Sequence, residues 1–263
     1  MKRKTIFFDV YQTLLSVDFK KNAKAWDVFS SFLSSRGVPA DTFRFQEMFD
    51  QEKQNYYHLA GDFEMKFRHH NLFDLIDTVL RKHGIGAGKK ELSDLIWKFR
   101  QIHSPDVKLY PGVEEILDEL YQKYILAIAS YAQGSYLPRE LEKLGIAKYF
   151  SHFIISSDIG YRKTDPEFYK ICLKKTQQKP AECLMIGDNY LQDVAMPKKA
   201  GIKAVLIRNP LTDKQNIIGN TKPDSIVKIE DMATLSSVIQ SILSPFAEDR
   251  ERLSSGEAGK LAS

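Results

Sequence analysis

The beginning of the chain combines a strand-like apolar run with a single acid. The stretch Lys4–Leu15 starts with apolar residues, reaches Asp9 and carries a hydroxyl four residues later at Thr13. A continuous apolar run is typical of a buried strand in a parallel sheet. We therefore predict a first strand that ends at Asp9, on the edge where open α/β sheets bind their ligands.

Long amphipathic segments follow this first strand. Their apolar residues recur at three- and four-residue steps, which predicts the helices Lys20–Arg36, Thr42–Leu59, Phe63–His83 and Lys90–His103. No strand-like run interrupts these segments. An all-helical insert directly after the first strand indicates a lid that closes over a site at the end of that strand.

Strand-like and helix-like segments alternate through the rest of the chain. The sheet pattern resumes at Leu109–Val113; predicted helices are Val113–Lys123, Leu137–Leu144, Pro166–Lys175 and Leu191–Ala200, and predicted strands are Tyr124–Ala129, Phe153–Ser156, Cys183–Ile186, Ala204–Ile207 and Ser225–Ile229. This alternation predicts a doubly wound parallel α/β sheet. We expect an α/β core over 1–16 and 106–245, a helical cap over 17–105 and a disordered tail over 246–263.

The composition narrows the range of partners. The 263 residues carry a net charge of +4 without a dense basic run, so no nucleic-acid partner is expected. No stretch approaches the roughly 20 apolar residues of a membrane helix. Cys172 and Cys183 lack a metal-type spacing and fit the core of a protein from a reducing compartment. We expect a cytoplasmic monomer or homodimer that acts on a small molecule.

Candidate chemistry lies at or just beyond the carboxyl ends of four predicted strands. The residues are Asp9 with Thr13, Ser130, Lys163, and Asp188 with Asp193. Each of them alone is more often a turn, cap or solvated residue, but strand ends on one edge of a sheet converge on one crevice. A carboxylate such as Asp9 can act as a nucleophile, and Lys163 would offset negative charge beside it.

The remaining members of this set fit phosphate and metal binding. Ser130 and Thr13 carry short hydroxyls that can hold a phosphoryl oxygen or orient Asp9. The carboxylates of Asp9 and Asp188 are hard oxygen ligands of the kind that Mg²⁺ prefers. Asp193 also fits the first turn of a helix, where the helix dipole favours an acid.

The four motifs, their order and the helical insert after the first resemble the haloacid dehalogenase superfamily over about Lys4–Ile207. The resemblance implies a Rossmann-like core with a helical cap and a nucleophile at Asp9. It implies catalytic positions at Asp9, Tyr11, Thr13, Ser130 and Lys163, and substrate binding by Ser130, Tyr131 and Lys163. Mg²⁺ would be bound by Asp9, Asp188 and the backbone carbonyl of Tyr11, with Asp193 orienting the metal's waters or Lys163.

The chain departs from the phosphatases of this superfamily at Tyr11. Those enzymes have there a second aspartate that protonates the leaving group, whereas a phenol titrates near pH 10 and is a poor base. Tyrosine at this position resembles the 2-haloacid dehalogenases, whose halide needs no proton. Those dehalogenases, however, work without a metal and use a cap arginine. The nearest basic residues, Arg36 and Arg44, are not at the expected place, where Asp50 stands instead.

Three hypotheses follow from this mixture of features. The leading one is a slow Mg²⁺-dependent phosphatase for small phosphorylated metabolites, with an aspartyl-phosphate at Asp9. The second is a metal-free 2-haloacid dehalogenase in which Asp9 attacks the halogen-bearing carbon. The third is a catalytically weak regulatory protein that binds the metal and a phosphate ester.

Overall fold

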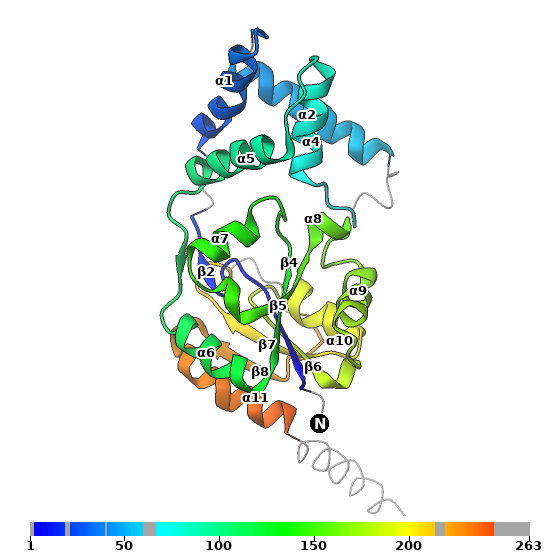
Figure 1. Cartoon of the computed structure of the whole chain (residues 1–263). Helices are drawn as coiled ribbons and strands as arrows, with labels where there is room; N and C mark the ends of the chain where they lie inside the picture. The colour runs from blue at the N-terminus through cyan, green and yellow to red at the C-terminus, as the bar shows by residue number, and fades with distance from the viewer. Residues whose placement is uncertain (1–2, 19–21, 40, 60–66, 214–218, 245–263) are drawn as a thin grey trace, which may run out of the picture.

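The computed structural model describes residues 3–18, 22–39, 41–59, 67–213 and 219–244. Its centre is a six-stranded parallel sheet in the order β5-β4-β1-β6-β7-β8 (Figure 1). The strands are β1 (Thr5–Phe8), β4 (Ile125–Ser130), β5 (Phe150–Ile155), β6 (Cys183–Gly187), β7 (Lys203–Arg208) and β8 (Ser225–Lys228). This sheet, with a helical region after the first strand, confirms the predicted fold class.

Helices cover both faces of the sheet. The helices α6 (Val113–Lys123), α7 (Leu137–Lys143) and α11 (Leu235–Leu243) pack on one face, and α9 (Pro166–Thr176) and α10 (Met196–Lys199) on the other. Side chains of β1 alternate between the two layers: Ile6 and Phe8 join the first, and Phe7 joins the second. Burial on both faces explains why this strand is apolar at successive positions.

The helices that follow β1 form a cap with its own core (Figure 1). They are η1 (Ala23–Trp26), α1 (Asp27–Ser35), α2 (Thr42–Leu59), α4 (Leu72–Lys82) and α5 (Lys89–His103). Aromatic rings fill this core, and Phe29 stacks on Phe45 with centroids 5.1 Å apart. Among the described residues, no helix is long and apolar enough to cross a membrane.

A small ribbon marks the point where the chain leaves and re-enters the sheet layer. The two-residue strands β2 (Leu15–Ser16) and β3 (Lys108–Leu109) pair antiparallel. The sheet pattern predicted for Leu109–Val113 is therefore wrong beyond Leu109, because the chain turns there and enters α6. Asp9 directly follows β1, and the cap lies beyond this end of the strand (Figure 1). The ribbon therefore brings the cap over the end of β1.

Two predicted helices differ from the structure. The helix expected from Phe63 begins at Leu72, while Arg68 instead forms a bridge to Tyr161; Phe63 itself, like Lys20 and the tail 246–263, lies outside the described residues. The helix expected over Leu191–Ala200 is a π-helical turn, η4 (Tyr190–Ala195), followed by α10. Pro197 stands in the first turn of α10, where its missing N–H is tolerated. The remaining short helices, α8 (Ser156–Ile159), η2 (Ala147–Tyr149), η3 (Pro180–Glu182) and η6 (Ile229–Thr234), lie in connections.

Candidate active site

Three buried carboxylates meet at the carboxyl ends of β1 and β6. Asp9 follows β1 directly, Asp188 follows β6, and Asp193 lies on η4. Each offers an oxygen that lies within 4.8 Å of the oxygens offered by the other two. Gly187 permits this approach, because a Cβ on it would overlap the carboxyl group of Asp193. The structure thus brings together the three acids that the sequence placed at one site.

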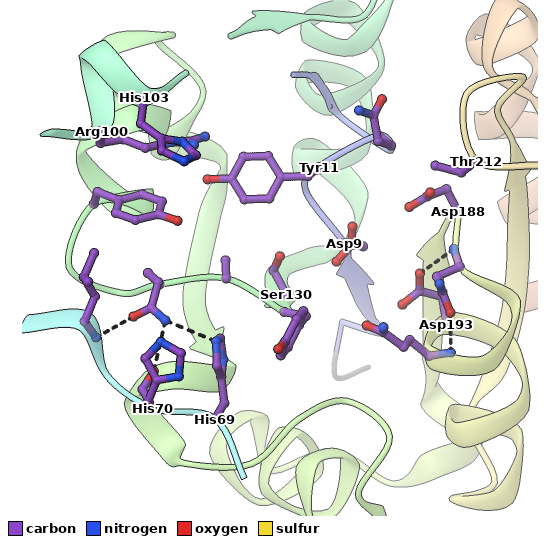
Figure 2. A pocket seen from close by; sticks show the side chains of 18 of the residues that line it. Asp9, Tyr11, His69, His70, Arg100, His103, Ser130, Asp188, Asp193 and Thr212 are labelled. Atoms are coloured by element: carbon purple, nitrogen blue, oxygen red, sulfur yellow. Dashed lines mark hydrogen bonds between the residues drawn. The ribbon is translucent and has the colours of Figure 1, made fainter. Parts of the chain in front are cut away.

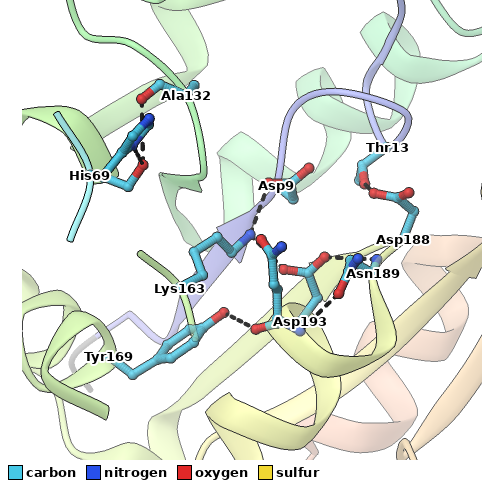
Figure 3. Close-up of polar contacts among 11 residues, drawn as sticks. Asp9, Thr13, His69, Ala132, Lys163, Tyr169, Asp188, Asn189 and Asp193 are labelled. Carbon is cyan, nitrogen blue, oxygen red and sulfur yellow. Dashed lines mark hydrogen bonds and ion pairs between the residues drawn. The ribbon is translucent and has the colours of Figure 1, made fainter. Parts of the chain in front are cut away.

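One lysine is inserted among these acids (Figure 3). Lys163 is fully buried, and its Nζ lies 2.8 Å from Asp9 Oδ1 and 2.5 Å from Asp193 Oδ1. Burial alone would lower the pKa of Lys163, but the carboxylates of Asp193 and Asp9 outweigh burial and raise that pKa. Lys163 therefore stays charged and compensates part of the negative charge.

The remaining negative charge is visible in the pKa values of the acids. Burial, with the charges of Asp9 and Asp193, raises the pKa of Asp188 to about 7. Burial raises the pKa of Asp193 to about 6, although Lys163 opposes this rise. Three carboxylates and one ammonium group leave an excess of negative charge in a buried place. A bound hard cation would remove that excess, so the donor set fits Mg²⁺.

The two predicted hydroxyls have different surroundings. Ser130 ends β4, and its Oγ is buried without a hydrogen-bond partner among the described residues. A buried hydroxyl without a partner is costly, so Ser130 is available for a ligand oxygen. Thr13 donates a hydrogen bond to Asp188 Oδ1 at 3.1 Å, so its hydroxyl orients Asp188 and not Asp9 (Figure 3).

Tyr11 points away from the acids and toward the cap (Figure 2). Its hydroxyl donates a hydrogen bond of 2.6 Å to Glu140 Oε2 on α7. Burial, with the neighbouring Tyr136, raises the pKa of Tyr11 well above its ordinary value. The phenol of Tyr11 therefore stays protonated and cannot act as a general base at neutral pH.

A buried ion pair between cap and core receives this hydroxyl. Arg100 on α5 donates to Glu140 Oε1 at 3.0 Å through Nε and to Oε2 at 3.3 Å, and both side chains are 6% exposed. The guanidinium also donates to Ser104 Oγ at 2.8 Å and lies 5.3 Å from the centroid of the Tyr11 ring. Tyr11, two residues after Asp9, is thereby connected to the cap.

A second polar network joins cap and core at Gln133. Its side-chain amide lies 3.1 Å from His69 Nε2, and its Oε1 accepts from the backbone N–H of Leu72 at 2.8 Å. The other ring nitrogen of His69 lies 2.5 Å from Ser156 Oγ. Burial lowers the pKa of His69 to about 3, and the neighbouring His70 adds to this lowering because two adjacent rings resist being protonated together. His69 is therefore neutral, with Nε2 as the acceptor for Gln133.

These groups line one cavity between cap and core, with a volume of about 610 Å³ (Figure 2). The acids and Ser130 form one end, and Tyr11, Arg100 and His69 line the remainder. The predicted substrate-binding residue Tyr131 also lines the cavity, and it stacks on His69 with centroids 4.3 Å apart. The site residues expected from the sequence therefore lie in or directly beside one cavity.

The cap does place an arginine in the cavity, but neither Arg36 nor Arg44 is that residue. Arg36 pairs with Glu91 at the surface, and Arg44 and Asp50 are exposed. The arginine in the cavity is Arg100, from the last cap helix. The spacing of residues on α5 could have identified Arg100. The buried face of this helix carries Leu92, Ile96, Phe99 and Arg100, so Arg100 is a charged residue at an otherwise apolar position. Glu140 likewise stands between the buried leucines of α7.

A comparison with family profiles agrees with this fold. A profile of the haloacid dehalogenase-like hydrolases matches residues 45–207, which is more than half of the chain. The protein therefore belongs to the haloacid dehalogenase-like hydrolase family.

Proteins of similar sequence include phosphatases, and one solved structure of similar fold is that of a dehalogenase. A pyrophosphatase of Oceanobacillus iheyensis is 27% identical over 190 residues, which cover 67% of this chain and 88% of the relative. A glyceraldehyde 3-phosphate phosphatase of Pyrococcus abyssi is 25% identical over 203 residues, covering 77% of this chain and 80% of the relative. The crystal structure of a 2-haloacid dehalogenase from Pseudomonas syringae has the same fold, with a TM-score of 0.60 and 20% identity over 90% of this chain and 98% of that one.

Proposed function

We propose that the protein is a Mg²⁺-dependent phosphatase for small phosphorylated metabolites, with Asp9 as the nucleophile. The observation that carries this proposal is the acid cluster at one end of the cavity, where three carboxylates lie together and one lysine pairs with two of them. The relatives described as a pyrophosphatase and a glyceraldehyde 3-phosphate phosphatase support the same reaction class.

The contacts of Asp9 favour attack by one particular oxygen. Lys163 binds Asp9 Oδ1, and no described residue donates a hydrogen bond to Oδ2. Oδ2 would form a bond to phosphorus while the bond to the ester oxygen breaks, and the departing alcohol takes a proton from water. A second water then hydrolyses the aspartyl-phosphate, which releases phosphate and restores the carboxylate. The hydroxyl of Ser130 would donate a hydrogen bond to a phosphoryl oxygen during both steps.

The metal would be held by the acids of the cluster. We assign Asp9, Asp188 and the backbone carbonyl of Tyr11 as its ligands, with Asp193 holding Lys163 in place beside them. Bound Mg²⁺ would offset the charges of the carboxylates and of the phosphoryl group. Thr13 would keep the Asp188 carboxylate in position through its hydrogen bond.

Slow turnover follows from the position of Tyr11. Its hydroxyl is engaged with Glu140 and its pKa is raised, so it supplies no proton to the leaving group. General acid–base catalysis typically contributes a factor of about 10² to 10⁴, and this chain lacks that contribution at the usual place.

The same tyrosine supports a second candidate function, a 2-haloacid dehalogenase. A departing halide needs no proton, so Tyr11 would cost that reaction nothing. The crowded carboxylate of Asp188 is unfavourable in a metal-free site, which makes this function the weaker proposal. Chloride release from 2-chloropropionate in the presence of EDTA would establish it, and no release at millimolar substrate would remove it.

The phosphatase proposal is tested by hydrolysis of 4-nitrophenyl phosphate with Mg²⁺ and with EDTA. We expect activity only with Mg²⁺, and a loss of at least about a thousandfold in Asp9→Asn because the nucleophile is absent. Asp188→Asn should lose both activity and the thermal stabilisation by Mg²⁺ alone. The matched control is Asp50→Asn on the cap surface, which should change neither.

Activity that persists in EDTA would contradict the proposal. Stabilisation by Mg²⁺ and inorganic phosphate without turnover of any phosphate ester would instead indicate the third hypothesis, a binding protein.

A further inference from the structure

We infer that the site selects phosphate esters whose alcohol part carries a ring and no charge. The inference rests on the proposed phosphatase function and concerns the part of the cavity beyond Ser130, away from the acids (Figure 2). A phosphoryl group at Asp9 would direct the alcohol part of the ester into this region. The residues that line it therefore determine which alcohols fit.

The surface of this region is largely apolar and aromatic. Its lining includes Tyr11, Leu72, Phe99, Ala132 and Tyr136. Rings pack on rings with a gain beyond the burial of area alone. The whole cavity of about 610 Å³ has room for a phosphate together with a six-membered ring.

Among the described residues that line the cavity there is one arginine, Arg100, and it is already paired. Arg100 binds both oxygens of Glu140, and the pair is nearly excluded from solvent. Glu140 receives a further hydrogen bond from Tyr11, and Arg100 gives one to Ser104. A carboxylate on the substrate would lose its hydration without gaining an unpaired cation from the described residues that line the cavity, which is costly. Arg162 lies beside Tyr131, with its guanidinium carbon 5.9 Å from the centroid of that ring, but it does not line the cavity.

The imidazoles and the amide of this region supply no positive charge either. His69 is neutral, and burial lowers the pKa of His70 to about 4. Both polar ends of the Gln133 side chain are used in the network between cap and core. His103 packs on Phe99 with centroids 5.4 Å apart, and its Nδ1 lies 3.0 Å from Ser104 Oγ. An assay at pH 8 keeps ordinary imidazoles uncharged and so removes them from the comparison.

Three substrates separate the contributions of ring and charge. We compare kcat/KM at pH 8 with Mg²⁺ for benzyl phosphate, 4-carboxybenzyl phosphate and ethyl phosphate. The two benzyl esters differ in a remote carboxylate, and ethyl phosphate lacks the ring. We expect benzyl phosphate to exceed each of the other two by about tenfold or more. Equal values, or a preference for the carboxylated or the ringless ester, overturn the inference.

A charge variant tests the cause of this selection. Glu140→Gln keeps an acceptor for Tyr11 and leaves the charge of Arg100 without its partner. The ratio of 4-carboxybenzyl to benzyl phosphate should then rise by about tenfold, because the carboxylate gains a cation. Glu142→Gln, at an exposed position of the same helix, is the matched control and should leave the ratio unchanged. An unchanged ratio in Glu140→Gln contradicts the role assigned to the ion pair.

Two further measurements keep the inference testable if a variant or the reaction fails. Arg100→Met with Glu140→Met removes both charges, and this double variant should retain the preference for benzyl phosphate; loss of that preference overturns the inference. If no ester is hydrolysed, the proposed function fails, while selection is still read from thermal stabilisation. Benzylphosphonate should then stabilise the wild-type protein more than 4-carboxybenzylphosphonate, and the reverse order contradicts the inference.

Discussion

The two ends of the cavity differ in whether their buried charges are balanced. At the acid end, Asp9, Asp188 and Asp193 lie together, the ammonium group of Lys163 pairs with Asp9 and Asp193, and the pKa of Asp188 is raised to about 7. At the cap end, the charge of Arg100 is matched by a carboxylate, and the buried His69 is neutral. Both ends are buried to a similar degree, so burial does not explain the difference.

This difference distinguishes two kinds of buried polar group. The unbalanced acids can bind a ligand, whereas the balanced ion pair stabilises the contact between cap and core. An excess of like charge in a buried place is tolerated where a bound ion or substrate will compensate it. A buried charge that is already paired binds a ligand of opposite charge only weakly. Removing one partner of such a pair, however, strongly lowers the stability of the fold. We therefore assign chemistry to the acid end, and cap placement and substrate selection to the other end.

The largest effect is expected when the pair at the cap end is broken. Arg100→Met leaves Glu140 buried without a countercharge, and should lower the free energy of unfolding by about 3 to 5 kcal/mol. Urea denaturation at pH 7 measures this loss. In the double variant Arg100→Met with Glu140→Met the loss should be much smaller, because two apolar side chains of similar length replace the pair. Equal losses in the single and double variants would show that packing, not charge, is the cause.

The sequence predicted the acid end better than the cap end for a physical reason. Asp9 and Asp188 each follow an apolar strand, and parallel strands that are neighbours in a sheet bring their ends together. The hydrogen bond from the backbone N–H of Asp9 to the carbonyl of Ile186 continues this pairing at 2.9 Å. Local sequence pattern and general sheet topology were therefore enough.

The cap end depends on how two layers pack against each other, which no local pattern states. Arg100 and Glu140 are 40 positions apart and belong to different layers. In the sequence, each is only a charged residue at a position where its helix is otherwise apolar. This pattern indicates a buried charge but does not indicate which residue pairs with it. The helix expected from Phe63 begins instead at Leu72, after an extended segment in which the backbone N–H of His69 binds the carbonyl of Gly160. Tertiary contacts decided that start.

A smaller but informative effect is expected at the position that connects the two ends. Tyr11→Asp would place a carboxyl group two residues after Asp9, on the lining of the same cavity, and would remove the hydroxyl that donates a hydrogen bond to Glu140. We expect kcat for 4-nitrophenyl phosphate to rise by about 100-fold, the lower part of the range for general acid–base catalysis. The same change should lower stability, because a ring is lost from a packed site.

The control for this change is Tyr11→Phe, which keeps the ring and removes the hydroxyl. It should lose part of the stability without any gain in turnover. A folded Tyr11→Asp protein that is stabilised by Mg²⁺ and is no faster than the wild type would contradict the explanation given for slow turnover.

The smallest effect concerns pH and the network around His69. Its pKa is about 3 in the folded protein, below the ordinary 6.5, because burial disfavours the charged ring. The unfolded chain therefore binds more protons than the folded chain between these values. The stability contributed by neutral His69 is complete above pH 6.5 and is lost as the pH falls toward 3. At pH 5 the free energy of unfolding has fallen by about 2 kcal/mol from this cause.

The raised pKa values of Asp188 and Asp193 act in the opposite sense over the same range, because the folded chain binds more protons at these acids than the unfolded chain does. The loss due to His69 is therefore measured as the difference between the denaturation midpoints of the wild type and His69→Gln from pH 5 to 7.5. Gln in place of His69 cannot be protonated at Nε, so this difference should grow as the pH falls, while the contributions of the two acids and of His70, whose pKa is about 4, remain in both proteins. His58→Gln, on the exposed surface of α2, should follow the wild type at every pH. Because protonation of His69 would direct an N–H at the amide of Gln133, the loss should appear first as opening of the cap from the core, seen as faster amide exchange at Leu72. Uniform exchange across the cap and sheet at pH 5 would place the acid sensitivity elsewhere.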